Sequence, residues 1–268
     1  MVSAVRKTVL QKRPGIILCD RNMNSEKTKR NYNQEYKDNT RKYAYDFDYT
    51  LRDFMVRTFQ PFFLKGKALE MGCYLGEFTK KIMKHYDDVT VIEASDELIA
   101  QAKENVGPSV KFIYSTFEEA NITEKYDCIF LMHTLEHLDN PIEILKKINS
   151  WLSETSRLFL VVPNANAASR QIAVKMGLIP YNTAVIESER LHGHRCTYNL
   201  DTLENEARQA NLKIINKGGV FFKALSGSQY DDALKAKVIT PAYLEGCYQL
   251  GMIYPDLCSS IYLICEKG

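Results

Sequence analysis

Two acidic residues follow short apolar runs with a spacing that suits a nucleoside-containing ligand. Glu70 ends a first run and is followed by Gly72 and Gly76, and Glu93 ends a second run 23 residues later. Glycine lets a backbone approach a ligand closely, and a carboxylate can accept hydrogen bonds from an amine or from ribose hydroxyls. In an open parallel sheet both acids would lie at the carboxyl ends of neighbouring strands.

A third element with suitable chemistry is the segment 115–118, which follows a third apolar run. The ring of Phe117 could lie against an adenine ring, although a core position would explain it equally well. Thr116 or a neighbour could bind the exocyclic amine of that ring. We therefore expect an adenine slot beside the two acids.

Histidines supply candidate groups for proton transfer. The segment 191–198 holds His192, His194, Arg195 and Tyr198 within eight residues, and His137 stands beside Glu136. Neutral imidazole is a suitable base near neutral pH, and a guanidinium can bind a substrate carboxylate with two hydrogen bonds. We expect His192, His194 and His137 to be catalytic candidates and Arg195 and Tyr198 to be substrate contacts, with a structural loop as the alternative.

No metal site is expected from the same segment. The two histidines of His-Gly-His could form a metal pair, but no set of Asp, Glu and Cys residues with obvious ligand spacing accompanies them. The tyrosine-rich stretch before the first apolar run, which includes Tyr43 and Tyr45, could instead supply rings to a cationic ligand through cation–π attraction.

The elements that position these residues alternate regularly. Apolar strand-like runs separated by helical segments predict a parallel sheet covered on both faces, and the runs are 67–72, 89–94, 110–115, 127–133 and 157–162. Ser95 is expected to cap the second of these helices. A later helix is expected at 201–212, capped by Asp201 and Glu204, then a strand at 213–225, a mostly helical stretch at 230–251 and a last strand at 260–267.

The predicted organisation has three parts. A basic arm spans 1–30, with eight Lys/Arg against two acids, a helical extension spans 31–64, and the sheet domain spans 65–268. Insertions are expected near 165–198 and 226–258, where they could form a lid, a packing element or a dimer contact.

Composition narrows the class of protein. The chain has 45% hydrophobic and 25% charged residues, no long apolar run and no secretory signal, so we expect a cytoplasmic protein with no membrane span. The seven cysteines show no CxxC pair, which favours buried thiols. A nucleic-acid partner is not favoured, because outside the arm the chain is slightly acidic.

A dinucleotide-dependent dehydrogenase is the main competing interpretation of the glycine turn. Such enzymes require GxGxxG, whereas this turn reads Gly72-Cys73-Tyr74-Leu75-Gly76. The tyrosine at 74 and the absence of a Tyr-x-x-x-Lys pair argue against that class.

The segments ALEMGCYLGEF, VIEAS and YDCIFLMHTLEHLDNP resemble motifs of class I S-adenosylmethionine-dependent methyltransferases, especially the group similar to ubiquinone-pathway O-methyltransferases. The resemblance covers about 65–165 by motif and 213–266 by architecture. It implies a Rossmann-like α/β fold with a seven-stranded, mostly parallel sheet of order 3-2-1-4-5-7-6, an antiparallel seventh strand, and insertions after strands 5 and 6.

The resemblance also implies a binding role for S-adenosylmethionine at particular residues. The methionine end would contact Glu70, Gly72 and Gly76, the ribose Glu93, and the adenine Thr116 and Phe117, while His133 would face the cofactor. Cys73, Ala94 and Tyr43 complete the expected cofactor contacts, and Tyr45 is expected on the substrate side. Tyr74 departs from the family pattern, because it replaces the middle glycine of E-x-G-x-G-x-G.

The implied activity is O-methylation of a hydroxyl or carboxylate on a small-molecule or peptide natural product. The outer segments GHRCTYNLDTLE and PAYLEGCYQLGMIYPDLCSSIYLICEKG are also similar to bacterial natural-product methyltransferases, including lanthipeptide carboxyl methyltransferases. N-methylation, a catalytically silent cofactor-binding partner subunit and arm-driven nucleic-acid modification remain as alternatives, and a homodimer is possible.

Overall fold

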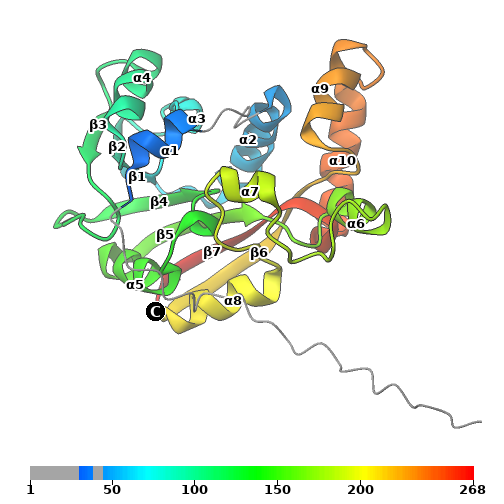
Figure 1. The fold of residues 1–268 in the computed structure, drawn as a ribbon. Coiled ribbons are helices and arrows are strands. Elements are labelled where there is room, and N and C mark those ends of the chain that lie inside the picture. Colours follow the sequence, from blue (N-terminus) through cyan, green and yellow to red (C-terminus); the bar gives the residue numbers. More distant parts are fainter. Residues whose placement is uncertain (1–29, 39–44) are drawn as a thin grey trace, which may run out of the picture.

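A computed structural model describes residues 30–38 and 45–268 of the chain (Figure 1). The expected basic arm, apart from Arg30, and the expected contact Tyr43 lie outside the described residues. A single seven-stranded sheet has the order β3-β2-β1-β4-β5-β7-β6, as the resemblance implied. Its strands are β1 (Lys67–Met71), β2 (Asp88–Glu93), β3 (Lys111–Tyr114), β4 (Tyr126–Met132), β5 (Leu152–Pro163), β6 (Leu212–Phe222) and β7 (Cys258–Lys267).

The strands β1 to β5 pair in parallel, and β7 pairs antiparallel with both β5 and β6. The register between β1 and β2 places Glu70 opposite Val91 and Met71 opposite Ile92. The two acid-bearing strand ends are therefore adjacent, which the sequence spacing predicted.

Helices connect and cover the strands. They are α1 (Tyr32–Asp38), α2 (Asp46–Phe59), α3 (Glu77–Ile82), α4 (Asp96–Val106), α5 (Pro141–Trp151), α6 (Ala168–Lys175), α7 (Glu187–Leu191), α8 (Leu200–Gln209), α9 (Gly227–Lys235) and α10 (Pro241–Ile253). Short 3-10 turns are η1 (Gln60–Phe62), η2 (Leu135–His137) and η3 (Pro255–Leu257). The insertion after β5 contains α6 and α7, and the insertion after β6 contains α9 and α10.

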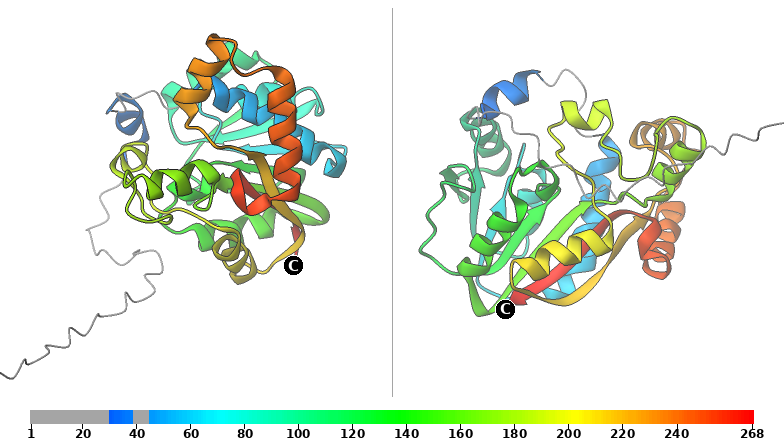
Figure 2. Two further views of the ribbon diagram at one scale, coloured as in Figure 1. Left: turned by 90° about the vertical axis from the view of Figure 1, so that its right-hand side faces the viewer. Right: turned by 60° about the horizontal axis from the view of Figure 1, so that its bottom comes forward.

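Alternating strand residues supply two cores, one on each face of the sheet. Phe159 and Val161 of β5 pack with apolar residues of α2, α3, α4, α9 and α10, whereas Leu158 and Leu160 pack with those of α5 and α8. Figure 2 shows α5 and α8 on the opposite side of the sheet from α2 and α10. Burial on both faces explains why the inner strands β1, β2 and β4 consist of nearly continuous apolar runs.

One expected helix cap is confirmed and another is wrong. The Ser95 hydroxyl accepts a hydrogen bond from the Leu98 amide at 3.1 Å, as predicted. The later helix begins at Leu200, because the Asn199 side chain accepts from the Thr202 amide at 2.9 Å and the Thr202 hydroxyl accepts from the Asn199 amide. Asp201 consequently lies inside the first turn and does not cap it.

Two expectations from composition can be compared with the described residues. Their six cysteines are all buried thiols, as predicted. No helix in residues 30–38 or 45–268 is long and apolar enough to cross a membrane.

Candidate functional site

A cavity of about 700 Å³ opens at the carboxyl ends of β1, β2 and β4. Helix α1, the N-terminal part of α2 and the segment 190–195 complete its walls. The cavity therefore forms at the edge where open α/β sheets bind ligands. The site residues expected from the sequence that line it are Glu70, Gly72, Cys73, Glu93, Ala94, Thr116, Phe117, His133, His137, His192, His194 and Arg195.

The glycine turn after β1 brings the backbone close to the cavity. Gly72 has φ +79°, a left-handed conformation that favours glycine, and a Cβ there would lie 3.2 Å from the Thr134 hydroxyl. Tyr74 also has a left-handed φ of 51°, so the backbone follows a glycine-type path despite the tyrosine. The Tyr74 ring makes an edge contact with Tyr36 at 6.2 Å between centroids.

Gly76 has a different role from the one expected. It begins α3 with φ +79°, and a Cβ there would lie 2.8 Å from Val106 Cγ1 of α4. Gly76 does not line the cavity. A glycine is required at position 76 for the turn and for packing between α3 and α4.

Backbone amides hold the Glu93 carboxylate in place. Its Oε1 accepts from the amides of Ala94 at 2.8 Å and Ser95 at 3.1 Å, and its Oε2 accepts from the Cys73 amide at 3.2 Å. Glu93 is 8% exposed, and this burial raises its pKa. Oε2 keeps capacity for a further hydrogen bond toward the cavity, whereas Oε1 already accepts two.

Glu70 lies deeper, at the base of the cavity. It is 1% exposed, and its Oε2 accepts from the Thr79 hydroxyl at 2.7 Å. Burial raises the pKa of Glu70 to about 8, against the opposing effects of that hydrogen bond and of the nearby Arg52 charge. A cationic ligand group beside Glu70 would favour its ionised form.

Arg52 of α2 is a cavity residue that the sequence analysis missed. Its Nη1 is buried and has no hydrogen-bond partner among the described residues, and its guanidinium lies over the Tyr49 ring at 5.1 Å from the centroid. A buried guanidinium nitrogen that lacks an acceptor is suited to an anionic ligand group. The only sequence feature that could have identified Arg52 was its position on the amphipathic helix before the sheet.

The expected adenine slot lies beside the glycine turn. The tip of the Phe117 ring lies 3.6 Å from the place where a Cβ would stand on Gly72, and Leu98 and Leu138 add apolar lining. The Thr116 hydroxyl accepts from the Glu119 amide at 3.2 Å, which starts the turn after β3. The slot therefore offers one aromatic face and aliphatic neighbours.

Helix α1 lies over the cavity and is tied to two walls. Arg30 donates from Nη1 to the His137 carbonyl at 2.8 Å and binds both carboxylate oxygens of Glu35. In the first turn of the helix, the Asn33 side chain accepts from the Ser95 hydroxyl at 2.6 Å. These contacts fix α1 as a partial cover, and Tyr32, Glu35 and Tyr36 of this helix line the cavity.

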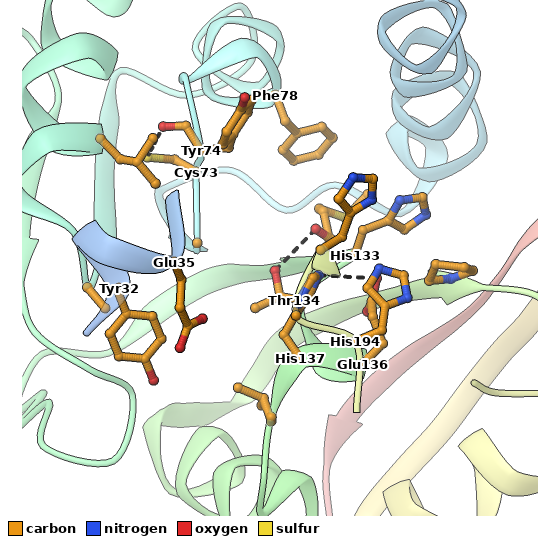
Figure 3. A pocket seen from close by; sticks show the side chains of 18 of the residues that line it. Tyr32, Glu35, Cys73, Tyr74, Phe78, His133, Thr134, Glu136, His137 and His194 are labelled. Carbon is orange, nitrogen blue, oxygen red and sulfur yellow. Dashed lines mark hydrogen bonds and ion pairs between the residues drawn. The ribbon is translucent and has the colours of Figure 1, made fainter. Parts of the chain in front are cut away.

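His133, His137 and His194 lie together on one side of the cavity (Figure 3). The rings of His137 and His194 meet edge-to-face with centroids 4.7 Å apart. The Arg195 amide donates to the Glu136 carbonyl at 2.7 Å, so the segment after α7 is joined to η2. Burial lowers the pKa of His194 to about 4, and it lowers the pKa of His137 as well.

Three further groups complete this side. Glu136 is 1% exposed and neither of its carboxylate oxygens accepts a hydrogen bond from the described residues, and burial raises its pKa to about 8. His133, at a left-handed φ of 51°, forms a 2.9 Å hydrogen bond between Nε2 and the Ser260 hydroxyl. Burial lowers the pKa of His133 to about 3, so it is neutral. Arg195 Nε donates to Asp139 at 3.0 Å.

Two residues expected on the substrate side lie elsewhere. Tyr198 is 1% exposed, and its hydroxyl donates to Glu206 of α8 at 2.9 Å, so it belongs to the core beneath the sheet. Tyr45 precedes α2 and its ring packs close to Gly227 at the start of α9. Neither lines the cavity. The sequence signal failed because proximity to other candidate residues along the chain does not fix the direction of a side chain.

Similarity to known proteins agrees with this geometry. A family model described as a methyltransferase domain matches residues 43–217. The chain is 22% identical over 189 residues to the mitochondrial ubiquinone biosynthesis O-methyltransferase of Schizosaccharomyces pombe, with 66% of each protein covered. The chain spans between 33% and 66% of the length of the first curated relatives that it matches.

Two solved structures share the fold at low sequence identity. The N-methyltransferase NodS from Bradyrhizobium japonicum, in complex with S-adenosylhomocysteine, has a TM-score of 0.56 at 13% identity and covers 88% of this chain and 97% of that chain. The plantazolicin methyltransferase BpumL, also in complex with S-adenosylhomocysteine, has a TM-score of 0.53 at 18% identity and covers 83% and 85%. Because the family model matches more than half of the sequence, the chain belongs to the methyltransferase domain family, with the Rossmann-like fold of S-adenosylmethionine-dependent methyltransferases.

Proposed function

We propose that the chain binds S-adenosylmethionine in this cavity and transfers its methyl group to an oxygen atom of a small-molecule or peptide acceptor. One observation carries the proposal. The Glu93 carboxylate, held by three backbone amides, faces the cavity at the end of β2, directly beside the glycine turn after β1. This arrangement is suited to the two hydroxyls of a ribose.

The adenosine part of the cofactor would lie between β2 and the turn after β3. The ribose hydroxyls would donate to Glu93, and the adenine would lie against Phe117 with Thr116 at its edge. Gly72 would permit close approach of the backbone, with Cys73 and Ala94 on either side. The apolar slot beside the glycine turn supports this placement, since the aromatic face of Phe117 can stack against the flat adenine ring.

The methionine part would extend toward Glu70 and Arg52. Its ammonium group would donate to the Glu70 carboxylate, and its carboxylate would accept from Arg52. Glu70 is buried and so is Nη1 of Arg52, and each group gains from the ligand the opposite charge that it needs. The neutral His133 would lie near the sulfonium without repelling its charge.

Methyl transfer itself requires little covalent help from the protein. A lone pair of the acceptor oxygen forms a bond to the methyl carbon while the carbon–sulfur bond breaks, and that bond pair stays on sulfur to give S-adenosylhomocysteine. Alignment of the two reactants can supply about 7–11 kcal/mol. A carboxylate acceptor has no proton to lose, whereas a hydroxyl proton would pass to a neutral histidine.

The acceptor would enter on the histidine side of the cavity. His192, His194 and His137 are the candidates to receive a proton or to position the acceptor, and Arg195 would attract a carboxylate at the rim. The depressed pKa values of His137 and His194 mean that both are neutral, the form that can accept a proton.

Oxygen is favoured as the acceptor atom by the curated relatives. The Schizosaccharomyces pombe relative is named as an O-methyltransferase, and two thirds of this chain aligns with it. A peptide acceptor is supported more weakly, through the fold shared with the plantazolicin methyltransferase.

The test is an incubation of the purified protein with S-adenosylmethionine carrying a labelled methyl group, together with extracts or peptides from its own producing cells. We expect one labelled methyl group on an oxygen and stoichiometric formation of S-adenosylhomocysteine. Mild base then separates the products, because a methyl ester loses its label whereas a methyl ether or methylamine keeps it. Cofactor binding without any transfer would identify a catalytically silent partner subunit and would refute the proposal, and a methylamine product would refute the choice of oxygen.

A further inference from the structure

One cation at the far end of the cavity is not explained by cofactor binding. Lys223 directly follows β6 and lines the cavity together with Ser259 and Ser260 at the start of β7. Its side chain is only partly exposed, and burial lowers the pKa of its ammonium group. Taking an ammonium group out of water without a counter-ion is costly. A group of this kind indicates a missing negative partner.

No acid within residues 30–38 and 45–268 forms an ion pair with this ammonium group. Asp48 and Asp231 act on it only through their charge, which opposes the larger effect of burial on its pKa. Asp48 accepts from the Tyr45 amide at 2.8 Å, and Asp231 accepts from the Phe47 amide at 2.9 Å. The Lys223 Nζ lies over the Phe47 ring, at 5.6 Å from its centroid. Lys223 therefore keeps its N–H donors for another group.

The arginines that line the cavity have other partners or another role. Arg30 and Arg195 each donate to a carboxylate. Arg190 is exposed to water. Arg52 faces the methionine part of the cofactor in the placement proposed above. Among the described cations of the cavity wall, Lys223 is thus the one left for the acceptor.

The backbone around Lys223 is held in a fixed path. Phe221, two residues earlier, has a left-handed φ of 68°, which is unusual for a bulky residue. Its ring packs against the Phe47 ring with centroids 5.2 Å apart. The Lys223 carbonyl accepts from the Ser169 amide of α6 at 2.9 Å. A strained conformation that packing maintains is frequent at functional sites.

The order of the strands places Lys223 on the acceptor side of the cavity (Figure 1). The proposed cofactor placement uses the ends of β1 and β2, with His133 at the end of β4 near the sulfonium. Strand β6 lies three positions beyond β4, and neighbouring strands are ~4.8 Å apart, so the two strand ends are roughly 14 Å apart along the sheet edge. A group bound by Lys223 therefore belongs to a part of the acceptor away from the cofactor.

We propose that Lys223 binds a carboxylate group of the acceptor, and that this carboxylate is separate from the oxygen that receives the methyl group. A singly charged carboxylate matches one lysine, whereas a phosphate group carries about −1.5 to −2 charges. Hydrogen bonds between an ammonium group and a carboxylate are roughly twice as strong as neutral ones. This role in acceptor recognition rests on the proposed methyl transfer, whereas the anion site itself does not.

The experiment compares carboxylic acids with their primary amides as ligands of the full chain saturated with S-adenosylhomocysteine. The probes are benzoate with benzamide, hexanoate with hexanamide, and N-acetylglycine with N-acetylglycinamide. The bound S-adenosylhomocysteine keeps the acids away from Arg52. Calorimetry and saturation-transfer NMR measure the affinities of the native chain, Lys223→Met and Lys223→Arg. The control is Lys235→Met, because Lys235 is exposed on α9 and does not line the cavity.

The native chain should bind at least one acid roughly 10- to 100-fold more tightly than the matching amide. Lys223→Met should abolish this difference, whereas Lys223→Arg and Lys235→Met should keep it. Equal affinities for acid and amide in the native chain would overturn the proposal. An acid preference that persists in Lys223→Met with a native circular dichroism spectrum would overturn it as well.

A second measurement on the native chain decides the case if Lys223→Met does not fold. Lysines are methylated reductively with formaldehyde, and the peptides are analysed by mass spectrometry. The preferred acid should slow the labelling of Lys223 but not that of Lys235, and the amide should slow neither. Labelling of Lys223 at an unchanged rate in the presence of the acid refutes the site.

S-adenosylhomocysteine binding and methyl transfer from labelled S-adenosylmethionine are measured in parallel. A methyl ester formed on the carboxylate of a probe would refute the separate recognition role. A chain that binds the cofactor and transfers methyl groups but shows no acid preference leaves the proposed function intact and refutes the anion site. A chain that prefers acids through Lys223 but does not bind the cofactor does the reverse.

Discussion

The substitution Glu93→Gln tests the cofactor site most directly. The carboxamide keeps one acceptor oxygen, which would stay at the Oε1 position because two amides, of Ala94 and Ser95, donate to it. Its NH₂ group would then face the Cys73 amide, which is itself a donor. The position that offers an acceptor to a ribose hydroxyl would become a donor.

The expected loss follows from the hydrogen bonds involved. A hydrogen bond to a charged group contributes about 1.5–3 kcal/mol, and the ribose can make two to a carboxylate. Losing one and weakening the other costs about 2–4 kcal/mol. At 1.4 kcal/mol for each factor of ten, the dissociation constant for S-adenosylmethionine should rise roughly 30- to 1,000-fold.

Calorimetric titration with S-adenosylmethionine measures this change. Glu104→Gln is the matched control, since Glu104 is exposed on α4 and does not line the cavity. The fold of Glu93→Gln should persist, because burial already disfavours the ionised form of Glu93. A folded Glu93→Gln chain that binds S-adenosylmethionine within about threefold of the native affinity would refute the placement of the ribose.

Three further predictions concern stability and pH. Gly76→Ala should lower the free energy of unfolding by about 1–3 kcal/mol, because the left-handed φ and the tight packing at Gly76 oppose a Cβ. Gly246 of α10 faces open space, so Gly246→Ala should raise the free energy of unfolding by about 0.5–1 kcal/mol. Urea unfolding measures both changes. The pKa of Glu70 is raised to about 8, so between about pH 4.5 and 8 the folded chain holds a proton that the unfolded chain releases. The free energy of unfolding should therefore contain a component that falls with rising pH by up to about 1.4 kcal/mol per pH unit. Unfolding measured across this pH range should show that Glu70→Gln removes this component. Equal pH slopes for the native chain and Glu70→Gln would contradict the raised pKa of Glu70. Tyr198→Phe should cost about 1–3 kcal/mol of stability, because it removes the hydrogen bond that the Tyr198 hydroxyl donates to buried Glu206. The KM values for cofactor and acceptor should stay unchanged, and a raised KM would restore a substrate role.

Local pattern predicted most of the fold. Runs of apolar residues identified the inner strands such as β1, β2 and β4, since a strand buried on both faces must be apolar throughout. The positions of Glu70 and Glu93 followed from the same pattern, because neighbouring parallel strands end at one edge of the sheet. The helix start at Asn199 was missed because several residues there can cap a helix, and only the packed chain selects one.

The candidate site could be predicted only in part. Arg52 reaches the cavity from a helix that precedes the sheet, and its sequence neighbours give no sign of a ligand. Glu136 lies beside His194 in the folded chain, although the segment 191–198 does not contain it. Tyr198 has the chemistry of a substrate contact, but its side chain turns into the core.

The sequence by itself determined which apolar run ends in an acid, which turn carries glycine and which family motif these segments form together. Tertiary structure alone decided which distant groups share the cavity, because loops that follow β4 and α7 meet only after the sheet has packed. The physical reason is that strand and helix periodicity is set by neighbouring residues, whereas the approach of Glu136, His137 and His194 depends on packing across more than fifty residues of chain.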